Sequence, residues 1–148
     1  MRDMTRWLGD GGMALVGLLG ASFEGFGDGE GGDGVRLGDG GWSRATWEPT
    51  AAACNPNGLV QAGAHAVVLD AAMSFAVNAG LDGRDRSRAT LEIKTETMRP
   101  ARAGDALVAT GAVVSMARQV AWTEGTVRDG EGRTVSRATA TFLLHREP

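Results

Sequence analysis

Cysteine and lysine are almost absent from this chain of 148 residues, with Cys54 and Lys94 the only examples. One cysteine excludes an internal disulfide and is typical of a protein from a reducing compartment. The small residues just before Cys54 favour packing over a nucleophilic role for its thiol. The formal net charge of −3 and the lack of a basic block argue against nucleic acid as a partner.

Long apolar segments are missing from the N-terminal region. Residues 13–21 form the only early apolar run, which is too short and too interrupted by glycine to span a membrane. Acidic Asp3 and Asp10 precede it and no small-x-small cleavage site follows, which argues against a signal peptide. We therefore expect a cytoplasmic protein that does not bind membranes. Residues 1–148 fit a single domain, with an N-terminal part at 1–41 and a core at 42–148.

The most informative segment is 55–78. Pro56 and the Asn57-Gly58 pair are typical of a tight loop, and Gly63 can stand just before a helix. Residues 64–77 contain no glycine or proline, and apolar residues fall on nearly every side of a helical wheel. This pattern predicts a helix that is buried among other elements.

One polar stripe interrupts the apolar surface of this predicted helix. Asp70, Ser74 and Asn78 follow one another at intervals of four residues, so they lie along one narrow face. Burial of an unpaired carboxylate is costly. Asp70 therefore bonds to nearby backbone, faces solvent along the stripe, or serves a function, and the spacing alone leaves these alternatives open.

The rest of the chain has strand patterns. The segments that alternate or are rich in strand-forming residues are 21–26, 42–48, 90–98, 106–116, 119–128 and 134–144. Residues 13–19 fit a short helix that packs Leu15, Leu18 and Leu19 onto the body. The glycine-rich segment 27–41 is too long for a tight hairpin, and it lacks the features of a phosphate-binding loop or a calcium-binding repeat.

This order of elements predicts an α+β fold. One curved antiparallel sheet, including a meander of the last three strands, wraps around a central helix. Such a sheet keeps an open edge, and association of two chains would cover it. We therefore expect at least a dimer.

An ordered set of residues resembles the hotdog-fold acyl-CoA thioesterases of the phenylacetyl-CoA and 4-hydroxybenzoyl-CoA type. The resemblance extends from about residue 48 to residue 145, and it is carried by Asn55, Asn57-Gly58, Val60, Gly63, Leu69-Asp70-Ala71-Ala72, Arg99-Pro100-Ala101 and Gly104-Asp105. The loop of that family usually ends in His-Gly-Gly, with an acidic residue nine positions after the histidine. This chain has Gln61-Ala62-Gly63 there, and Asp70 lies nine positions after Gln61.

The resemblance implies hydrolysis of acyl-CoA thioesters to a free acid and CoA. Asp70 matches the catalytic carboxylate, which acts as general base or nucleophile. Asn55 matches an amide that orients water or the thioester, although an asparagine here also forms turns. The backbone N–H of Ala62 matches the donor that polarises the thioester carbonyl at the start of the helix. Gln61 and Gly63 complete the substrate-binding loop.

Two hydroxyls compete as the helper of the carboxylate. Ser74 lies one helical turn after Asp70, whereas Thr90 opens the next strand and matches the resemblance equally well. Strict alternation along that strand places Thr90 on the same face as Glu92 and Lys94, which favours a plain strand threonine unless a bulge intervenes.

The remaining polar residues have weaker assignments. Arg118, Arg133 and Arg137 could bind the phosphates of CoA, and solvated strand faces explain any one of them as well. His65 fits a packing or interface role, and His145 lies near the chain end.

The resemblance also implies an oligomeric state, and it leaves two alternatives for the function. It implies a homodimer, often paired into a homotetramer, with each site shared by two subunits. We expect no metal and no cofactor besides the CoA of the substrate. Two alternatives remain: a non-catalytic acyl-CoA-binding or structural dimer, and a hydratase or dehydratase, for which no histidine is present at 55–63.

Overall fold

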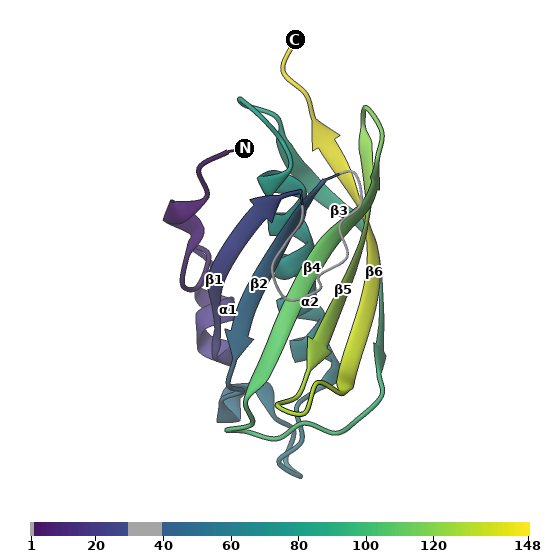
Figure 1. The fold of residues 1–148 in the computed structure, drawn as a ribbon. Helices are drawn as coiled ribbons and strands as arrows, with labels where there is room; N and C mark the ends of the chain where they lie inside the picture. The colour runs from purple at the N-terminus through teal and green to yellow at the C-terminus, as the bar shows by residue number, and fades with distance from the viewer. Residues whose placement is uncertain (1, 30–39) are drawn as a thin grey trace.

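The computed structural model describes residues 2–29 and 40–148 and shows a six-stranded sheet curved around one long helix (Figure 1). Most of the glycine-rich segment predicted at 27–41 lies outside the described residues. The elements, in chain order, are η1 (Thr5–Trp7), α1 (Ala14–Leu19), β1 (Ala21–Asp28), β2 (Gly41–Trp47), η3 (Ala51–Ala53), α2 (Ala62–Ala79), β3 (Arg86–Thr97), β4 (Leu107–Met116), β5 (Val120–Arg128) and β6 (Thr134–His145).

The sheet is antiparallel and has the strand order β1-β2-β4-β5-β6-β3. Neighbouring strands β4, β5 and β6 form the expected meander, and α2 lies against the concave face (Figure 1). The prediction of one curved antiparallel sheet around a central helix is therefore confirmed. β1 belongs to the same sheet as the later strands, so the N-terminal part and the core share one layer.

Helix α2 forms the centre of the hydrophobic core. It extends two residues beyond each end of the predicted 64–77, and its fully buried side chains include Val68, Leu69 and Met73. Judged by length and composition alone, α2 is apolar enough to cross a membrane. Because 61% of it is buried within the fold, it has the character of a core helix, and a single such helix is weak evidence for a membrane span.

Glycines allow α2 to approach the sheet backbone closely. A side-chain carbon on Gly111 of β4 would lie against the Ala72 carbonyl and 2.8 Å from the Met73 nitrogen. Gly41 of β2 and Gly80 just after α2 face each other in the same way. These positions fix the depth of the helix in the curved sheet, since no other residue fits between the two backbones.

The N-terminal segment packs differently from the prediction. In α1, Val16 and Leu19 are buried, whereas Leu15 and Leu18 are 50% and 60% exposed. The helix has only six residues, so one narrow face reaches the body, and the spacing of three places Val16 and Leu19 on it. The expectation that Leu15 and Leu18 pack inward is wrong.

This segment also covers one edge of the sheet. The backbone N–H and carbonyl of Gly9 bond to Phe23 of β1 at 2.9 and 2.6 Å. The Trp7 ring lies 6.1 Å from the ring of Phe75 on α2. The segment is therefore a brace along β1, and the opposite edge strand is β3.

The close approach at Gly111 predicts a strong effect of a single methyl group. Gly111→Ala should lower the free energy of unfolding by about 1–3 kcal/mol, because the added carbon meets the backbone of α2 at Ala72 and Met73. Denaturant or thermal unfolding measures the change. Gly130→Ala is the matched control, since its added carbon meets no atom within 4 Å, and it should shift stability by less than about 0.5 kcal/mol. Equal stabilities of the two variants would contradict the packing described.

Candidate active site

The polar stripe of α2 faces the edge strand β3. Near the end of the helix, Ser74 Oγ lies 3.1 Å from Ser87 Oγ, and Asn78 bonds both the hydroxyl and the backbone N–H of Ser87. Nearer the middle of the helix, Thr90 Oγ1 donates to Asp70 Oδ1 at 2.7 Å. Two parts of the stripe therefore differ. Ser74 and Asn78 tie the helix to β3, whereas the Asp70 carboxylate is held by the hydroxyl of Thr90.

A β-bulge turns Thr90 toward the helix. Thr90 pairs with Phe142 and Glu92 pairs with Thr141, so Leu91 is an extra residue between two adjacent pairs. Cross-strand partners lie on the same face, and Phe142 is buried in the core. Strict alternation had placed Thr90 with Glu92 and Lys94, and the bulge makes that expectation wrong. It is Thr90, not Ser74, that contacts Asp70.

A shallow pocket of about 370 Å³ opens beside this pair, between α2 and β3. Most of its lining is apolar. The residues that line it are Ala66, Val67, Asp70, Thr90, Leu91, Glu92 and Ile93. Asp70 thus lies at the wall of an apolar pocket, which is a common setting for a reactive carboxylate.

The loop before α2 is held by its own polar groups. Asn55 Oδ1 accepts hydrogen bonds from the backbone N–H groups of Asn57 and Leu59, at 2.9 and 3.1 Å. Gln61 donates its backbone N–H to Ala53 and its side-chain amide to the Cys54 carbonyl. The oxygen of Asn55 therefore shapes the turn, as an asparagine in such a loop commonly does.

The first turn of α2 begins at Ala62. Gln61 precedes it with φ −68° and ψ 148°, and its side chain makes no capping hydrogen bond. Ala62 and Gly63 are both exposed, and nothing lies within 4 Å of a side-chain carbon added to Gly63. Backbone N–H groups at such a helix start carry partial positive charge, which favours an anion or a developing oxyanion.

His65 is a core residue. It is fully buried, its Nδ1 lies 2.8 Å from Ser136 Oγ, and its ring packs edge-on against Trp47. Burial lowers the pKa of His65 from 6.5 to about 4. Its neutral ring joins the first turn of α2 to the start of β6, in agreement with the packing role expected from the sequence.

Comparison with known families decides the classification. The family model described as the thioesterase superfamily matches residues 57–136, which is more than half of the chain and includes the loop, α2 and β3. The chain belongs to the thioesterase superfamily. No curated protein matches it.

Several solved structures share its hotdog fold. A protein from Ralstonia eutropha, described as a thioesterase related to phenylacetic acid degradation, is 27% identical, with a TM-score of 0.70 over 88% of this chain and 89% of its own. The Escherichia coli PaaI protein, from the phenylacetic acid degradation operon, is 20% identical, with a TM-score of 0.70 over 93% and 86%. A Streptococcus mutans protein bound to acetyl CoA is 19% identical, with a TM-score of 0.67 over 84% and 91%.

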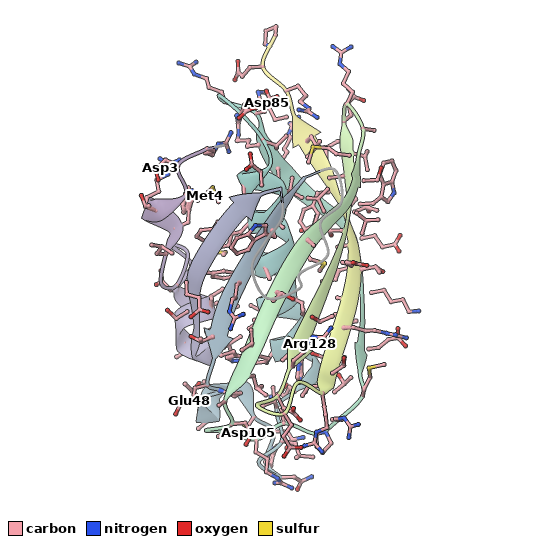
Figure 2. All side chains as sticks on the ribbon, viewed as in Figure 1. Asp3, Met4, Glu48, Asp85, Asp105 and Arg128 are labelled. Carbon is pink, nitrogen blue, oxygen red and sulfur yellow. The ribbon has the colours of Figure 1, made fainter. Side chains whose placement is uncertain are left out.

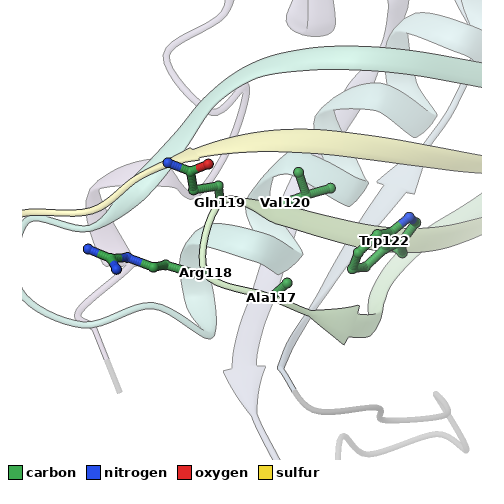
Figure 3. Close-up of a pocket in the computed structure, with 5 residues that line it drawn as sticks. All are labelled: Ala117, Arg118, Gln119, Val120 and Trp122. Carbon is green, nitrogen blue, oxygen red and sulfur yellow. The ribbon is translucent and has the colours of Figure 1, made fainter.

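The arginines considered for CoA phosphates lie away from the pocket beside Asp70 in this thioesterase-superfamily chain. Arg133 pairs with Asp129 at 2.8 Å, and Arg137 pairs with Glu96 at 3.2 Å on the outer face of the sheet. Arg118 lies in the β4–β5 turn and lines a separate pocket with Trp122, and its side chain points away from that ring (Figure 3).

The end of the molecule near Arg118 is held by the C-terminal residues. Arg146 donates to the carbonyls of Arg118 and Ala117 and to Asp85, and the backbone N–H of Glu147 also bonds Asp85. These contacts hold the pKa of the Asp85 carboxyl below its usual range, with the Glu147 N–H as the main cause. Asp85 lies at the opposite end of the molecule from Glu48 and Asp105, which are near the start of α2 (Figure 2).

Sequence reasoning missed Arg102, which lies beside the loop that leads into α2. Leu59 and Arg102 form an isolated β-bridge, and the Val60 N–H bonds the Ala101 carbonyl at 2.8 Å. The sequence pattern drew attention to Arg99-Pro100-Ala101, but only the bridge to Leu59 shows that Arg102 is the arginine beside the loop. In the described part of the chain, no group of His, Cys, Asp or Glu is arranged to hold a metal ion.

The buried His65 predicts a pH dependence of stability. Its folded pKa lies below the unfolded value, so the unfolded chain binds the proton first as the pH falls. The free energy of unfolding should therefore decrease between about pH 6.5 and pH 4, by up to about 3 kcal/mol from this group. His65→Phe keeps a ring against Trp47 and should flatten the profile in that window, as measured by denaturant unfolding at several pH values. Parallel profiles for the parent and the variant would contradict the assignment.

Proposed function

We propose that this protein hydrolyses acyl-CoA thioesters to a free acid and CoA. The observation that carries the proposal is the Asp70 carboxylate, held by Thr90 Oγ1 at 2.7 Å at the wall of an apolar pocket between α2 and β3. Membership of the thioesterase superfamily supports thioester hydrolysis in general. The Streptococcus mutans neighbour that carries acetyl CoA supports CoA as the carrier of the acyl group.

In this proposal Asp70 acts as general base or nucleophile. As a base, it takes a proton from water while the water oxygen attacks the thioester carbonyl. As a nucleophile, its oxygen attacks the carbonyl directly, and water then cleaves the resulting anhydride. In both routes the C–S bond breaks and CoA leaves as a thiol after protonation. Thr90 donates to Oδ1 and orients the carboxylate so that Oδ2 meets the substrate.

The oxyanion donor in this proposal is the backbone N–H of Ala62. Ala62 and Asp70 are eight residues apart on α2, which separates them by about 12 Å along the axis. One carbonyl cannot contact both groups of the same helix, since a hydrogen bond extends about 3 Å. The site therefore combines Ala62 of one chain with Asp70 of a second chain.

The edge strand β3 is the surface through which two chains associate in this proposal. The N-terminal brace covers β1 at Gly9, whereas Leu91 of β3 and Met98 just after it expose large apolar side chains. Pairing of two β3 strands would join the sheets and bring both pockets to the interface. A homodimer is the minimum, and pairing of dimers gives a homotetramer. Arg102 beside the loop is the candidate for the CoA phosphates, and the proposal needs no other cofactor.

Substitutions at the carboxylate and its helper test the chemistry. Asp70→Asn should lower kcat by about a hundredfold or more, because it removes the base or nucleophile. Thr90→Val should lower kcat by about tenfold through loss of the orienting hydrogen bond. Ser74→Ala should have a smaller effect than Thr90→Val, since Ser74 bonds Ser87 instead. Release of free thiol from a panel of acyl-CoAs measures turnover.

Thr139→Val provides a matched control, since Thr139 is exposed on the outer face of β6. It should leave turnover unchanged, and circular dichroism should show that every variant is folded. Parent-level turnover in folded Asp70→Asn would refute the proposal. CoA binding by a parent protein that hydrolyses no thioester would instead favour the non-catalytic binding protein.

Mixed dimers test whether two chains share the site. Ala62→Pro removes the N–H, and proline suits the first position of a helix that follows the extended Gln61. It should cost about a hundred- to a thousandfold in turnover. Coexpression of Ala62→Pro with Asp70→Asn should restore about a quarter of parent activity, because half of the dimers are mixed and each has one intact site.

Light scattering should show a dimer or tetramer for the parent and for both variants. A coexpressed mixture that is no more active than either variant alone would show that the two groups do not meet across chains. A stable and active monomer would contradict both the shared site and the β3 interface.

A further inference from the structure

The groove between α2 and β3 is closed at its C-terminal end. Ser74 and Asn78 of the helix are tied to Ser87 of the strand by hydrogen bonds of 2.9–3.1 Å. These bonds hold the last turns of α2 against the start of β3. An acyl group bound next to Asp70 therefore cannot extend in that direction.

In the other direction the helix presents a small side chain. Ala66 is one helical turn before Asp70, about 6 Å along the axis, and it continues the stripe of Asp70. Ala66 and Val67 are both half-buried, and they line the pocket together with Leu91 and Ile93 of β3. The free volume beside the carboxylate thus lies over Ala66.

The pocket does not continue beneath the helix. Leu69 and Met73 are fully buried, and a side-chain carbon added to Gly125 of β5 would lie 3.1 Å from Leu69 Cδ2 and 3.2 Å from Met73 Cγ. The same tight approach occurs at Gly111. Within the described part of the chain, side chains of the core fill the space between α2 and the sheet, so a long acyl chain has no tunnel to enter.

We infer that Ala66 sets the size of the acyl group, and that the subsite over Ala66, Val67, Leu91 and Ile93 takes a compact apolar acyl group in preference to a long fatty chain. This inference rests on the proposed hydrolysis at Asp70. A methyl group at position 66 leaves the pocket open beside the carboxylate. A larger side chain there fills the volume that the acyl group occupies, while a smaller one at Ile93 enlarges it.

Acyl-CoAs of different chain length test the inference. The kcat/KM of acetyl-, hexanoyl- and palmitoyl-CoA, each below its micelle concentration, is measured for the parent, Ala66→Leu and Ile93→Ala. The parent should prefer hexanoyl- over palmitoyl-CoA by about tenfold or more. Ala66→Leu should lower the hexanoyl-to-acetyl ratio by about tenfold or more, and Ile93→Ala should raise it, since each methylene that fits or clashes in such a pocket changes kcat/KM by about 10- to 200-fold.

Ala14→Leu is the matched control, because Ala14 is an exposed alanine of α1. It adds the same atoms away from the pocket and should leave the ratio unchanged. A parent that prefers palmitoyl-CoA, or a folded and dimeric Ala66→Leu with the parent's ratio, would overturn the inference. If Ala66→Leu does not assemble, Ile93→Ala decides, and an unchanged ratio counts against the subsite.

The two proposals fail in different ways. Turnover of acyl-CoAs that depends on Asp70 but not on the side chain at position 66 refutes the subsite and leaves the proposed hydrolysis intact. Absence of turnover with every acyl-CoA in the parent refutes both.

Discussion

The contact between the backbone of α2 and the backbone of the sheet is the constraint on which the rest of the structure depends. Gly111 in β4, and Gly41 facing Gly80, remove the side chains that would hold the layers apart. Once the helix is seated at this depth, its rotation is fixed, because the tightly packed Ala72 must face β4. The polar stripe that begins at Asp70 can then face only the edge strand.

The edge strand β3 supplies the hydrogen-bond donor for the Asp70 carboxylate of α2. A carboxylate on a core helix needs a donor. The bulge at Leu91 turns the hydroxyl of Thr90 inward, and β3 still pairs with β6 on both sides of it. The residues beyond Thr90 keep their alternation, so Ile93 still lies beside the pocket. The same stripe of α2 therefore has two roles. Ser74 and Asn78 bond Ser87 and hold the helix against β3, and Asp70 accepts the hydrogen bond of Thr90 at the pocket.

Most of the fold could be predicted from periodicity, because apolar patterns reflect which faces are buried. The helix at 64–77 and the strands were located to within a few residues, although β3 begins at Arg86, before the predicted position 90. The side chain that contacts Asp70 could not be derived, since a bulge depends on pairing with β6 and leaves no local signal. The exposure of Leu15 and Leu18 could not be derived either, because it depends on how α1 docks on the body, and a pattern within six residues does not specify that.

The brace at Gly9 has a consequence for how large an assembly can become. A sheet with two bare edges can add further copies at both ends without limit, which is the geometry of a fibril. In this chain the brace bonds β1 at Phe23, and β3 is the edge without such a contact among the described residues. Joining two copies at that edge consumes it in both, so growth of the sheet terminates at a pair. The contact of Gly9 with β1 therefore limits how many copies one continuous sheet can contain.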